Sequence, residues 1–378
     1  MKIYFDNAAT TPLDPEVLDV MIPALREDFG NPSSTHAFGR KVKAHIEQAR
    51  KTIANLLNVT PGEIIFTSGG TEADNMAIRC SVEDLGVRHI ITSPIEHHAV
   101  LHTVEAICSR HNVELHNVNL LPDGHVDLTH LETLLKDNTN VLVSLMHGNN
   151  EVGNLLDLEK VSALCQQYKA LFHSDTVQTM GHYRFDFQKL NIDFAVGSAH
   201  KFNGPKGIGF LYFNKRNKIK PLITGGAQER EMRAGTENIY GIIGLAKALE
   251  IAYRDLDKKQ AHISAIKQYF IKKLKENFPD IRLNGDAEGR SLYTILSVAF
   301  PPSVANDMLL FNFDLHGIAI SGGSACTSGS NAGSHVIRAI GSNLDYSPVR
   351  FSFGKYNTLE EVDFTINYIK SLFSQAQA

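Results

Sequence analysis

Residues 63–75 read EIIFTSGGTEADN and predict a strand, a tight turn and a helix in immediate succession. The run Glu63–Thr67 is apolar enough for a buried strand, and Glu72–Arg79 has the apolar spacing of a helix. Gly69 and Gly70 between them let backbone amides approach a ligand closely, and the start of a helix favours an anion. The turn therefore fits either a phosphate cradle or a tight turn that needs glycine only for its backbone angles. It lacks the lysine of a nucleotide P-loop, which argues against ATP.

Short apolar runs continue to alternate with helical patterns after this stretch. Such strand–helix–strand repetition favours a mostly parallel sheet with helices on both faces. Further strands are expected at His89–Ser93, Glu114–Asn119, Val141–Leu145, Leu171–Ser174, Phe194–Gly197 and Gly209–Phe213, with helices at Ala99–His111, Leu128–Lys136 and Leu158–Tyr168.

The last third of the chain has a different pattern. A helical pattern from about Ile242 to Phe278 is interrupted by charges such as Arg254 and Asp255, which indicates a surface helix. Thr358 followed by Glu361 matches a capping box at the start of the final helix. Strands are expected at Tyr293–Phe300, Ile318–Ser321 and Val349–Ser352, and helices near Ala305–Phe313, His335–Ile340 and Leu359–Phe373.

The chain has 378 residues, more than one hydrophobic core usually organises. We therefore predict an α/β protein in three parts: an N-terminal arm (1–14), a large α/β domain on a mostly parallel seven-stranded sheet (15–250) and a smaller α+β domain (251–378). Ligands of open parallel sheets bind beyond the carboxyl ends of the strands. Residues that directly follow strands are thus the candidates for a site.

Composition excludes several classes of function. A net charge of −4 provides no basic face for nucleic acid. No apolar run is long enough to cross a bilayer, and the first residues, MKIYFDNAATTP, do not resemble a signal peptide. The four cysteines are far apart and form no CxxC pair, so we expect neither a disulfide framework nor a structural zinc site. A reducing cytoplasm fits this cysteine usage best.

Lys201 lies in SAHKFNGP, residues 198–205, directly after an apolar strand. A partly buried lysine at a strand end can keep its amine neutral, which a Schiff base with a carbonyl cofactor requires. Asp175 follows another strand and could keep a pyridine nitrogen protonated, with Gln178 three residues further on. The alternatives are a surface-loop lysine and a helix-capping aspartate.

His97 and Asn150 follow two further strands. The imidazole of His97 can stack on a cofactor ring and carry protons near neutral pH, or it can be a solvated loop histidine. Zinc binding by His97 together with His98 is disfavoured because adjacent side chains diverge. Asn150 supplies an amide donor, or it belongs to a turn.

Cys326 differs from the other three cysteines. It lies in SGGSACTSGS, residues 321–330, which is too polar and glycine-rich to pack as core. We expect an exposed, mobile loop whose thiol reaches a bound substrate, although a spare cysteine in a linker is the alternative. Cys80, Cys108 and Cys165 lie among apolar neighbours in helical patterns and are expected to be buried and inert.

Arg350 follows Ser347-Pro348 on the last predicted strand. It could clamp a substrate carboxylate through two parallel hydrogen bonds, or it could be a surface arginine.

The motifs together resemble the cysteine desulfurases of the NifS/IscS group, within the class V aminotransferase-like enzymes of pyridoxal phosphate (PLP) fold type I. The resemblance covers nearly the whole chain. It rests on YFDNAATTP, FGNPSSTH, FTSGGTEADN, EHHAVL, HGNNEVG, HSDTVQTMG, GSAHKFNGPKGIG, RAGTENI, SGGSACTSGS and VRFSFGKYNT, which occur in this order.

This resemblance implies a role for each candidate. Lys201 would carry pyridoxal 5′-phosphate as a Schiff base, Asp175 would pair with the ring nitrogen and His97 would stack on the ring. Arg350 would bind the carboxylate of L-cysteine, and Cys326 would take the sulfur as a persulfide, leaving alanine. Gly70, Thr71, Ser198 and His200 would hold the phosphate, Gln178 and Asn150 would contact the ring hydroxyl region, and Thr236 would reach the phosphate of a neighbouring subunit in a homodimer.

The same resemblance implies delivery of sulfur to an acceptor protein, for iron–sulfur clusters, tRNA thiolation or both. Two departures bear on that delivery. The loop continues as SNAGSHVIRAIG where relatives often have a LEPSYVLRALG-like stretch. The chain also ends soon after Leu359–Phe373, so we expect it to lack the longer tail by which some relatives hold a scaffold protein.

Two rival functions stay open at this point. An aminotransferase or a selenocysteine lyase would share the fold and the cofactor, but transamination needs no thiol at Cys326. A degenerate PLP-fold interaction protein would lack chemistry altogether, although every key position is intact in this sequence.

Overall fold

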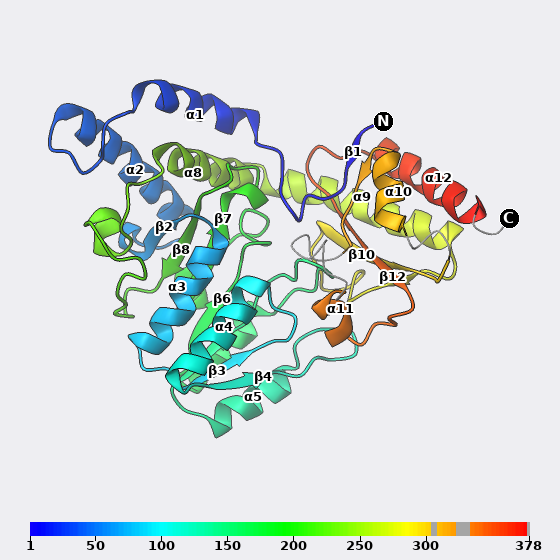
Figure 1. The fold of residues 1–378 in the computed structure, drawn as a ribbon, viewed down its shortest axis with the longest axis horizontal. Helices are drawn as coiled ribbons and strands as arrows, with labels where there is room; N and C mark the ends of the chain where they lie inside the picture. Colours follow the sequence, from blue (N-terminus) through cyan, green and yellow to red (C-terminus); the bar gives the residue numbers. More distant parts are fainter. Residues whose placement is uncertain (304–307, 323–332, 376–378) are drawn as a thin grey trace.

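The computed structural model describes residues 1–303, 308–322 and 333–375, with side chains to residue 373. These residues form a large unit around a seven-stranded sheet and a smaller unit around a three-stranded sheet, which lie side by side (Figure 1).

The large sheet has the strand order β2-β8-β7-β6-β5-β3-β4. Six of its strands run parallel, and β8 runs antiparallel to both of its neighbours. The predicted seven-stranded, mostly parallel sheet is therefore confirmed. The strands are β2 (Ile64–Thr67), β3 (His89–Thr92), β4 (Glu114–Asn117), β5 (Val141–Ser144), β6 (Leu171–Ser174), β7 (Phe194–Ser198) and β8 (Gly209–Phe213).

Helices cover both faces of this sheet because successive strand residues point to opposite faces and both sets are apolar. In β2, for example, Ile64 and Phe66 join one hydrophobic cluster and Ile65 joins another. One face is covered by α3 (Gly70–Glu83) and α4 (His98–His111). The other face is covered by α2 (Ala37–Leu56), α5 (Leu128–Asp137), α6 (Leu158–Gln167), α7 (Phe187–Leu190) and α8 (Ile239–Arg254).

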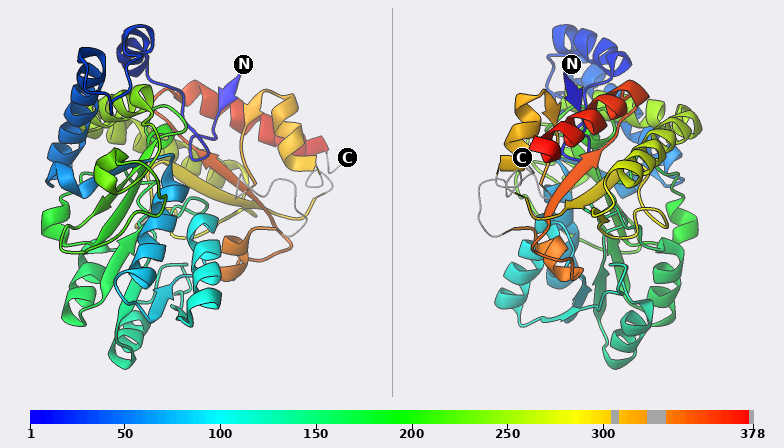
Figure 2. Two further views of the ribbon diagram at one scale, coloured as in Figure 1. Left: turned by 60° about the vertical axis from the view of Figure 1, so that its left-hand side comes forward. Right: turned by 90° about the vertical axis from the view of Figure 1, so that its right-hand side faces the viewer.

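Helix α1 (Pro15–Glu27) and helix α2 pack against α8, as the left view of Figure 2 shows. Three short 3₁₀ turns complete the large unit. They are η1 (Pro61–Glu63), η2 (Ala199–Lys201) and η3 (Gln228–Glu231).

The small unit has an antiparallel sheet in the order β12-β10-β9, with β9 (Arg282–Leu283), β10 (Ile295–Phe300) and β12 (Ser347–Ser352). The start of the chain joins it, because β1 (Ile3–Tyr4) pairs in parallel with β11 (Ile318–Ala319). Phe5 packs in the same hydrophobic cluster as Phe351. The helices of this unit are α9 (Leu256–Asn277), α10 (Leu309–Leu315), α11 (His335–Ala339) and α12 (Leu359–Gln375). The boundaries at residues 14 and 250 stay a prediction.

The prediction of a single surface helix from Ile242 to Phe278 is wrong. The backbone leaves the helical region at Asp255 (φ −102°, ψ 13°) and separates α8 from α9. Helix α8 is also mostly buried, since Leu245 and Leu249 belong to the main core beneath α1 and α2. The sequence pattern does not predict α1 or α2, so it gives no sign of what covers α8.

The predicted capping box is confirmed at the start of α12. The backbone N–H of Thr358 donates to Oε2 of Glu361 (3.0 Å), and the N–H of Glu361 donates to Oγ1 of Thr358 (3.3 Å). Of the helices in the described part of the chain, none is both long and apolar enough to cross a membrane.

Candidate active site

A cavity of about 250 Å³ opens beyond the carboxyl ends of β2, β3, β5, β6 and β7, where parallel strands direct their following loops to one edge. Ten of the predicted site residues line it. The lining consists of Ala8, Ala9, Gly70, Thr71, Asp74, His97, Met146, Asn150, Asp175, Val177, Gln178, Ser198, His200, Lys201 and Arg350.

Two glycines allow close packing around the turn after β2. A Cβ on Gly70 would lie 2.7 Å from Cγ2 of Val177, and a Cβ on Gly209 would lie 2.8 Å from Cα of Gly69. Glycine thus lets the start of α3 sit directly on β7 and β8. Because the first N–H groups of a helix have no partner within it, this end of α3 presents donors and a positive dipole end to the cavity.

Lys201 ends the 3₁₀ turn η2 and is partly buried, so it is not a free surface lysine. Its Nζ donates to the backbone oxygens of Ala8 (2.6 Å) and Ala9 (3.0 Å). Nε2 of Gln178 donates to the same Ala8 oxygen (3.0 Å). The N-terminal arm therefore forms part of the cavity wall, and its backbone oxygens hold the side chain of Lys201 in place.

Asp175 is buried, and its Oδ1 accepts a hydrogen bond from the N–H of Val177 (2.9 Å). It thus caps a turn as well as facing the cavity. Burial raises the pKa of Asp175, against the opposing effects of the nearby His97, the Val177 N–H and Lys201. A cationic partner in the cavity would offset the energetic cost of burying the Asp175 carboxylate.

His97 is the N-cap of α4, and its Nδ1 accepts a hydrogen bond from the N–H of Ala99 (3.1 Å). Burial lowers the pKa of His97, which favours the neutral ring at neutral pH. Since Nδ1 is an acceptor, the proton of the neutral ring is on Nε2. The histidine is therefore a positioned side chain and not a solvated loop residue.

His200 also lines the cavity, and its Nδ1 lies 3.1 Å from Oγ1 of Thr10. Burial, followed by the charges of Lys201 and Lys206, lowers the pKa of His200 to about 4. This ring is therefore neutral at neutral pH and can offer a hydrogen bond from a fixed position.

Asp74, one helical turn after Gly70, forms the base of the cavity. Burial, then the charges of Asp175 and Glu96, raise the pKa of Asp74 well above its usual value. Nε2 of His173 lies 3.3 Å from Oδ1 of Asp74, and burial lowers the pKa of His173 to about 3. Burial therefore disfavours the charged form of both groups.

Arg350 on β12 brings the small unit to the cavity. It is buried, so the alternative of a surface arginine is wrong. Its Nη1 donates to the backbone oxygen of Asn150 (2.7 Å), and its Nη2 pairs with Oδ1 of Asp6 (2.9 Å). Its Nε is buried without a hydrogen-bond partner among the described residues, which leaves an unused donor at the site.

Two predicted residues are not placed in the cavity. Cys326 lies outside the described residues. Thr236 is exposed between η3 and α8 and does not line this cavity. Arg233 in the same loop ties that loop to α3 through two hydrogen bonds to the carboxylate of Glu72 (2.8 and 3.1 Å).

The other three cysteines fit the prediction of inert thiols only in part. Cys80 and Cys165 are buried, but Cys108 is half-buried. Burial raises the pKa of all three thiols, that of Cys80 to about 12. None of them is activated as a thiolate.

Sequence reasoning missed several lining residues. The backbone oxygens of Ala8 and Ala9 have no side-chain signature, and Met146 reads as core. Asp74 had a usable signal, because it lies four residues after Gly70 and so on the same face of α3.

The family model for the class-V aminotransferases matches residues 3–364. The cysteine desulfurase IscS of Dictyoglomus turgidum is 41% identical, with 99% of this chain and 95% of the relative covered. The cysteine desulfurase IscS of Methanosarcina thermophila is 40% identical, with 98% and 91% covered. The chain belongs to the NifS/IscS group of class-V aminotransferases.

Solved structures agree with this NifS/IscS assignment. A NifS-like protein superposes with a TM-score of 0.91 at 38% identity, with 99% of this chain and 100% of that chain covered. SspA in complex with cysteine superposes with a TM-score of 0.80 at 32% identity, with 95% and 100% covered. The predicted PLP fold type I is thereby confirmed. Members of this class are enzymes that depend on pyridoxal 5′-phosphate, and this chain is one of them.

The residues around the cavity fit that cofactor. The start of α3, where a Cβ on Gly70 would clash, suits a phosphate, and the buried carboxyl of Asp175 suits a protonated ring nitrogen. Lys201 supplies the only side-chain amine among the described residues that line the cavity.

Proposed function

We propose that this enzyme is a cysteine desulfurase that converts L-cysteine to L-alanine and leaves the sulfur on Cys326. The observation that carries the proposal is the convergence of Lys201, Asp175 and Arg350 on one cavity, in a chain of the NifS/IscS group. These three side chains answer three needs of the reaction: a proton carrier, a partner for the cofactor ring and a site for the substrate carboxylate.

Pyridoxal phosphate, when bound, withdraws electrons from the Cα of the amino acid. Asp175 would hold the ring nitrogen protonated, and that proton would in turn stabilise the buried carboxylate. The first turn of α3, with Gly70 and Thr71, would bind the phosphate together with Ser198 and His200. Gln178 and Asn150 would contact the ring near its hydroxyl group.

Lys201 would hold the cofactor and carry protons to and from the Cα of the substrate. The oxygens of Ala8 and Ala9 hold Nζ in the cavity. His97 would stack on the ring, and the hydrogen bond that its Nδ1 accepts from α4 directs the Nε2 proton away from the helix, where it can be passed to the substrate.

Arg350 binds the carboxylate of L-cysteine. Its guanidinium is already charged, buried and oriented by Asp6, so substrate meets a fixed donor set. The unused Nε is one donor available for this contact.

Sulfur transfer requires a second thiol. The thiolate of Cys326 attacks the sulfur of the substrate, the S–S bond forms and the Cβ–S bond breaks. The electron pair of the broken bond remains with the substrate carbon, which takes up a proton to give alanine. L-cysteine and the Cys326 thiol thus become L-alanine and a Cys326 persulfide, with no external oxidant.

The test is Cys326→Ala in the holoenzyme. Alanine and sulfide formation should fall to background, while the visible absorbance of the cofactor persists. An aminotransferase would not lose activity, so normal alanine formation by Cys326→Ala would sink the proposal.

The protein functions as a homodimer in this proposal, with Thr236 reaching the phosphate of the neighbouring subunit. Its exposure and its absence from this chain's own cavity support that role. The sulfur acceptor is a scaffold or carrier protein for iron–sulfur cluster assembly or tRNA thiolation. Because Cys326 must be a free thiol, we place the enzyme in the reducing cytoplasm.

Dimerisation can be tested by mixing two inactive variants. Thr236→Ala and Lys201→Ala homodimers should both be impaired, and mixed dimers should regain one working site. Equilibrium sedimentation that shows only monomer would contradict the homodimer.

A further inference from the structure

A cluster of two histidines and one glutamate lies on the large sheet, apart from the cavity. His89 begins β3, and Glu114 and His116 lie on the neighbouring edge strand β4. The register pairs His89 with Glu114, while Glu114 and His116 are two residues apart. All three side chains therefore point to the same face of the sheet. His89 is at the amino end of β3, whereas His97 follows its carboxyl end.

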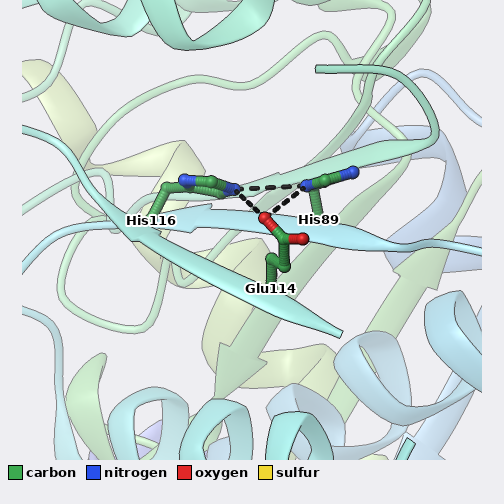
Figure 3. Close-up of side chains that lie close together, drawn as sticks. All are labelled: His89, Glu114 and His116. Atoms are coloured by element: carbon green, nitrogen blue, oxygen red, sulfur yellow. Dashed lines mark hydrogen bonds and ion pairs between the residues drawn. The ribbon is translucent and has the colours of Figure 1, made fainter. Parts of the chain in front are cut away.

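The three side chains converge on one point, as Figure 3 shows. Nδ1 of His89 lies 3.2 Å from Nε2 of His116. Oε2 of Glu114 lies 3.7 Å from the His89 nitrogen and 3.9 Å from the His116 nitrogen. Among the described residues, this is the only group of three or more such ligands whose atoms lie within 4.8 Å of one another.

These separations are those of metal ligands. Ligand atoms 2.0–2.2 Å from a tetrahedral Zn²⁺ lie about 3.3 to 3.6 Å apart. Shifts of the ligand atoms by roughly 0.5 Å or less would bring the three observed distances into that range. The side chain of Glu114 is exposed, so its carboxylate has room to move.

The ligand types also favour a transition metal. The cluster offers one carboxylate and two imidazole nitrogens. Imidazole and carboxylate together suit zinc and its neighbours better than Mg²⁺ or Ca²⁺, which prefer oxygen alone.

We propose that His89, Glu114 and His116 bind a divalent transition-metal cation of the zinc type, with solvent completing its coordination. The ion joins β4 to β3. Since β4 is an edge strand that pairs only with β3 among the described strands, this cross-link holds the edge of the sheet. The site is independent of the proposed desulfurase reaction.

The experiment uses the full-length holoenzyme with Cys326→Ser, which removes the proposed catalytic thiol as a competing metal ligand. Zn²⁺ affinity is measured by competition with a chromophoric chelator, and the melting temperature is measured against Zn²⁺ concentration. A hundredfold excess over Kd should raise the melting temperature by roughly 2–5 °C.

His116→Gln keeps a hydrogen-bonding amide but removes a ligand, and it should weaken Zn²⁺ binding by more than about tenfold. Glu114→Gln alters an exposed side chain, so it tests the site without risk to the fold. The matched control is His111→Gln, which removes a surface histidine paired with a single carboxylate, that of Glu83 at 3.4 Å, and should change nothing.

Bound Co²⁺ provides the ligand signature. Its visible bands should show nitrogen and oxygen ligation without thiolate charge transfer, and they should disappear in His116→Gln. Equal Zn²⁺ affinity in His116→Gln, Glu114→Gln and the parent would overturn the proposal. So would a parent whose melting temperature does not respond to Zn²⁺, because the cluster would then be only a hydrogen-bonded histidine pair.

Discussion

The two walls of the cavity come from different units of the fold and reach it differently. The wall from the large sheet consists of residues that directly follow parallel strands, such as Asp175 after β6 and Lys201 after β7. The opposite wall joins distant parts of the chain, because Asp6 of the arm holds Arg350 of β12. We infer that the first wall holds the cofactor and moves protons, whereas the second selects the substrate.

Lys201→Ala should have the largest effect and should act on turnover. Loss of a positioned proton carrier costs about 10²- to 10⁴-fold in rate. The measurement is kcat for alanine formation from L-cysteine, together with the cofactor absorbance, which should shift because the lysine no longer binds pyridoxal phosphate. Lys206→Ala is the matched control, since Lys206 is exposed in the same loop. If Lys201→Ala raised only KM, the proposed division between the walls would be wrong.

Arg350→Lys tests the same division of roles at the wall that we infer selects the substrate. Lysine keeps the charge beside Asp6 but loses the planar fork, and one lost charge-assisted hydrogen bond is worth about 1.5–3 kcal/mol. KM for L-cysteine should therefore rise about 10- to 100-fold, with kcat nearly unchanged. Arg282→Lys, on the exposed edge of the same three-stranded sheet, should have no effect. A fall in kcat at constant KM would contradict the role of Arg350.

The difference between the walls also explains what the sequence could reveal. Strand positions in the large sheet were predicted to within two residues, because apolar runs between polar turns are local signals. The residues after those strands were therefore identified correctly as neighbours. The contact between Asp6 and Arg350 spans 344 positions, and the oxygens of Ala8 and Ala9 have no side-chain signal. Only tertiary packing brings them together.

The burial of α8 was missed for the same reason. Its sequence carries charges near Arg254, and its burial depends on α1 and α2 lying over it. The break at Asp255 then allows α9 to leave the large unit and pack in the small one.

Gly70→Ala should have an intermediate effect on cofactor binding. The added Cβ would lie 2.7 Å from Cγ2 of Val177, so the start of α3 must shift from the position in which it would bind the phosphate. We expect pyridoxal phosphate affinity to fall about tenfold, the scale of one lost charge-assisted contact. Titration of the apoenzyme measures it.

The double variant Gly70→Ala/Val177→Ala distinguishes this clash from other effects. Removing Cγ2 of Val177 should restore most of the affinity. Gly62→Ala, where a Cβ would meet its nearest neighbour at an acceptable 3.4 Å, is the control. A double variant as weak as Gly70→Ala alone would show that the close packing is not the reason for glycine.

Asp74→Asn should have the smallest effect and should act on stability. The pKa of Asp74 is raised in the folded state, chiefly by burial, so this carboxyl stays protonated where the unfolded chain is ionised. The contribution of the Asp74 carboxyl to the free energy of unfolding is complete below pH 3.8, its ordinary pKa. This contribution is lost as the pH rises toward the pKa of Asp74 in the folded state. Asparagine keeps the neutral shape and cannot ionise. The unfolding free energy of the variant should therefore fall less steeply with rising pH, by up to about 1.4 kcal/mol per pH unit.

Urea midpoints at pH 5 and pH 7 provide the measurement, with Glu83→Gln, exposed on the same helix, as the control. Parallel curves for Asp74→Asn and the parent protein would mean that Asp74 is ionised in the folded state. In that case the base of the large-sheet wall would hold a negative charge close to Asp175. The pairing of Asp175 with a protonated ring nitrogen would then no longer be the only electrostatic anchor for the cofactor. The contrast between an uncharged Asp74 at the base of the cavity and the charged pair of Asp6 and Arg350 in the opposite wall would also fail.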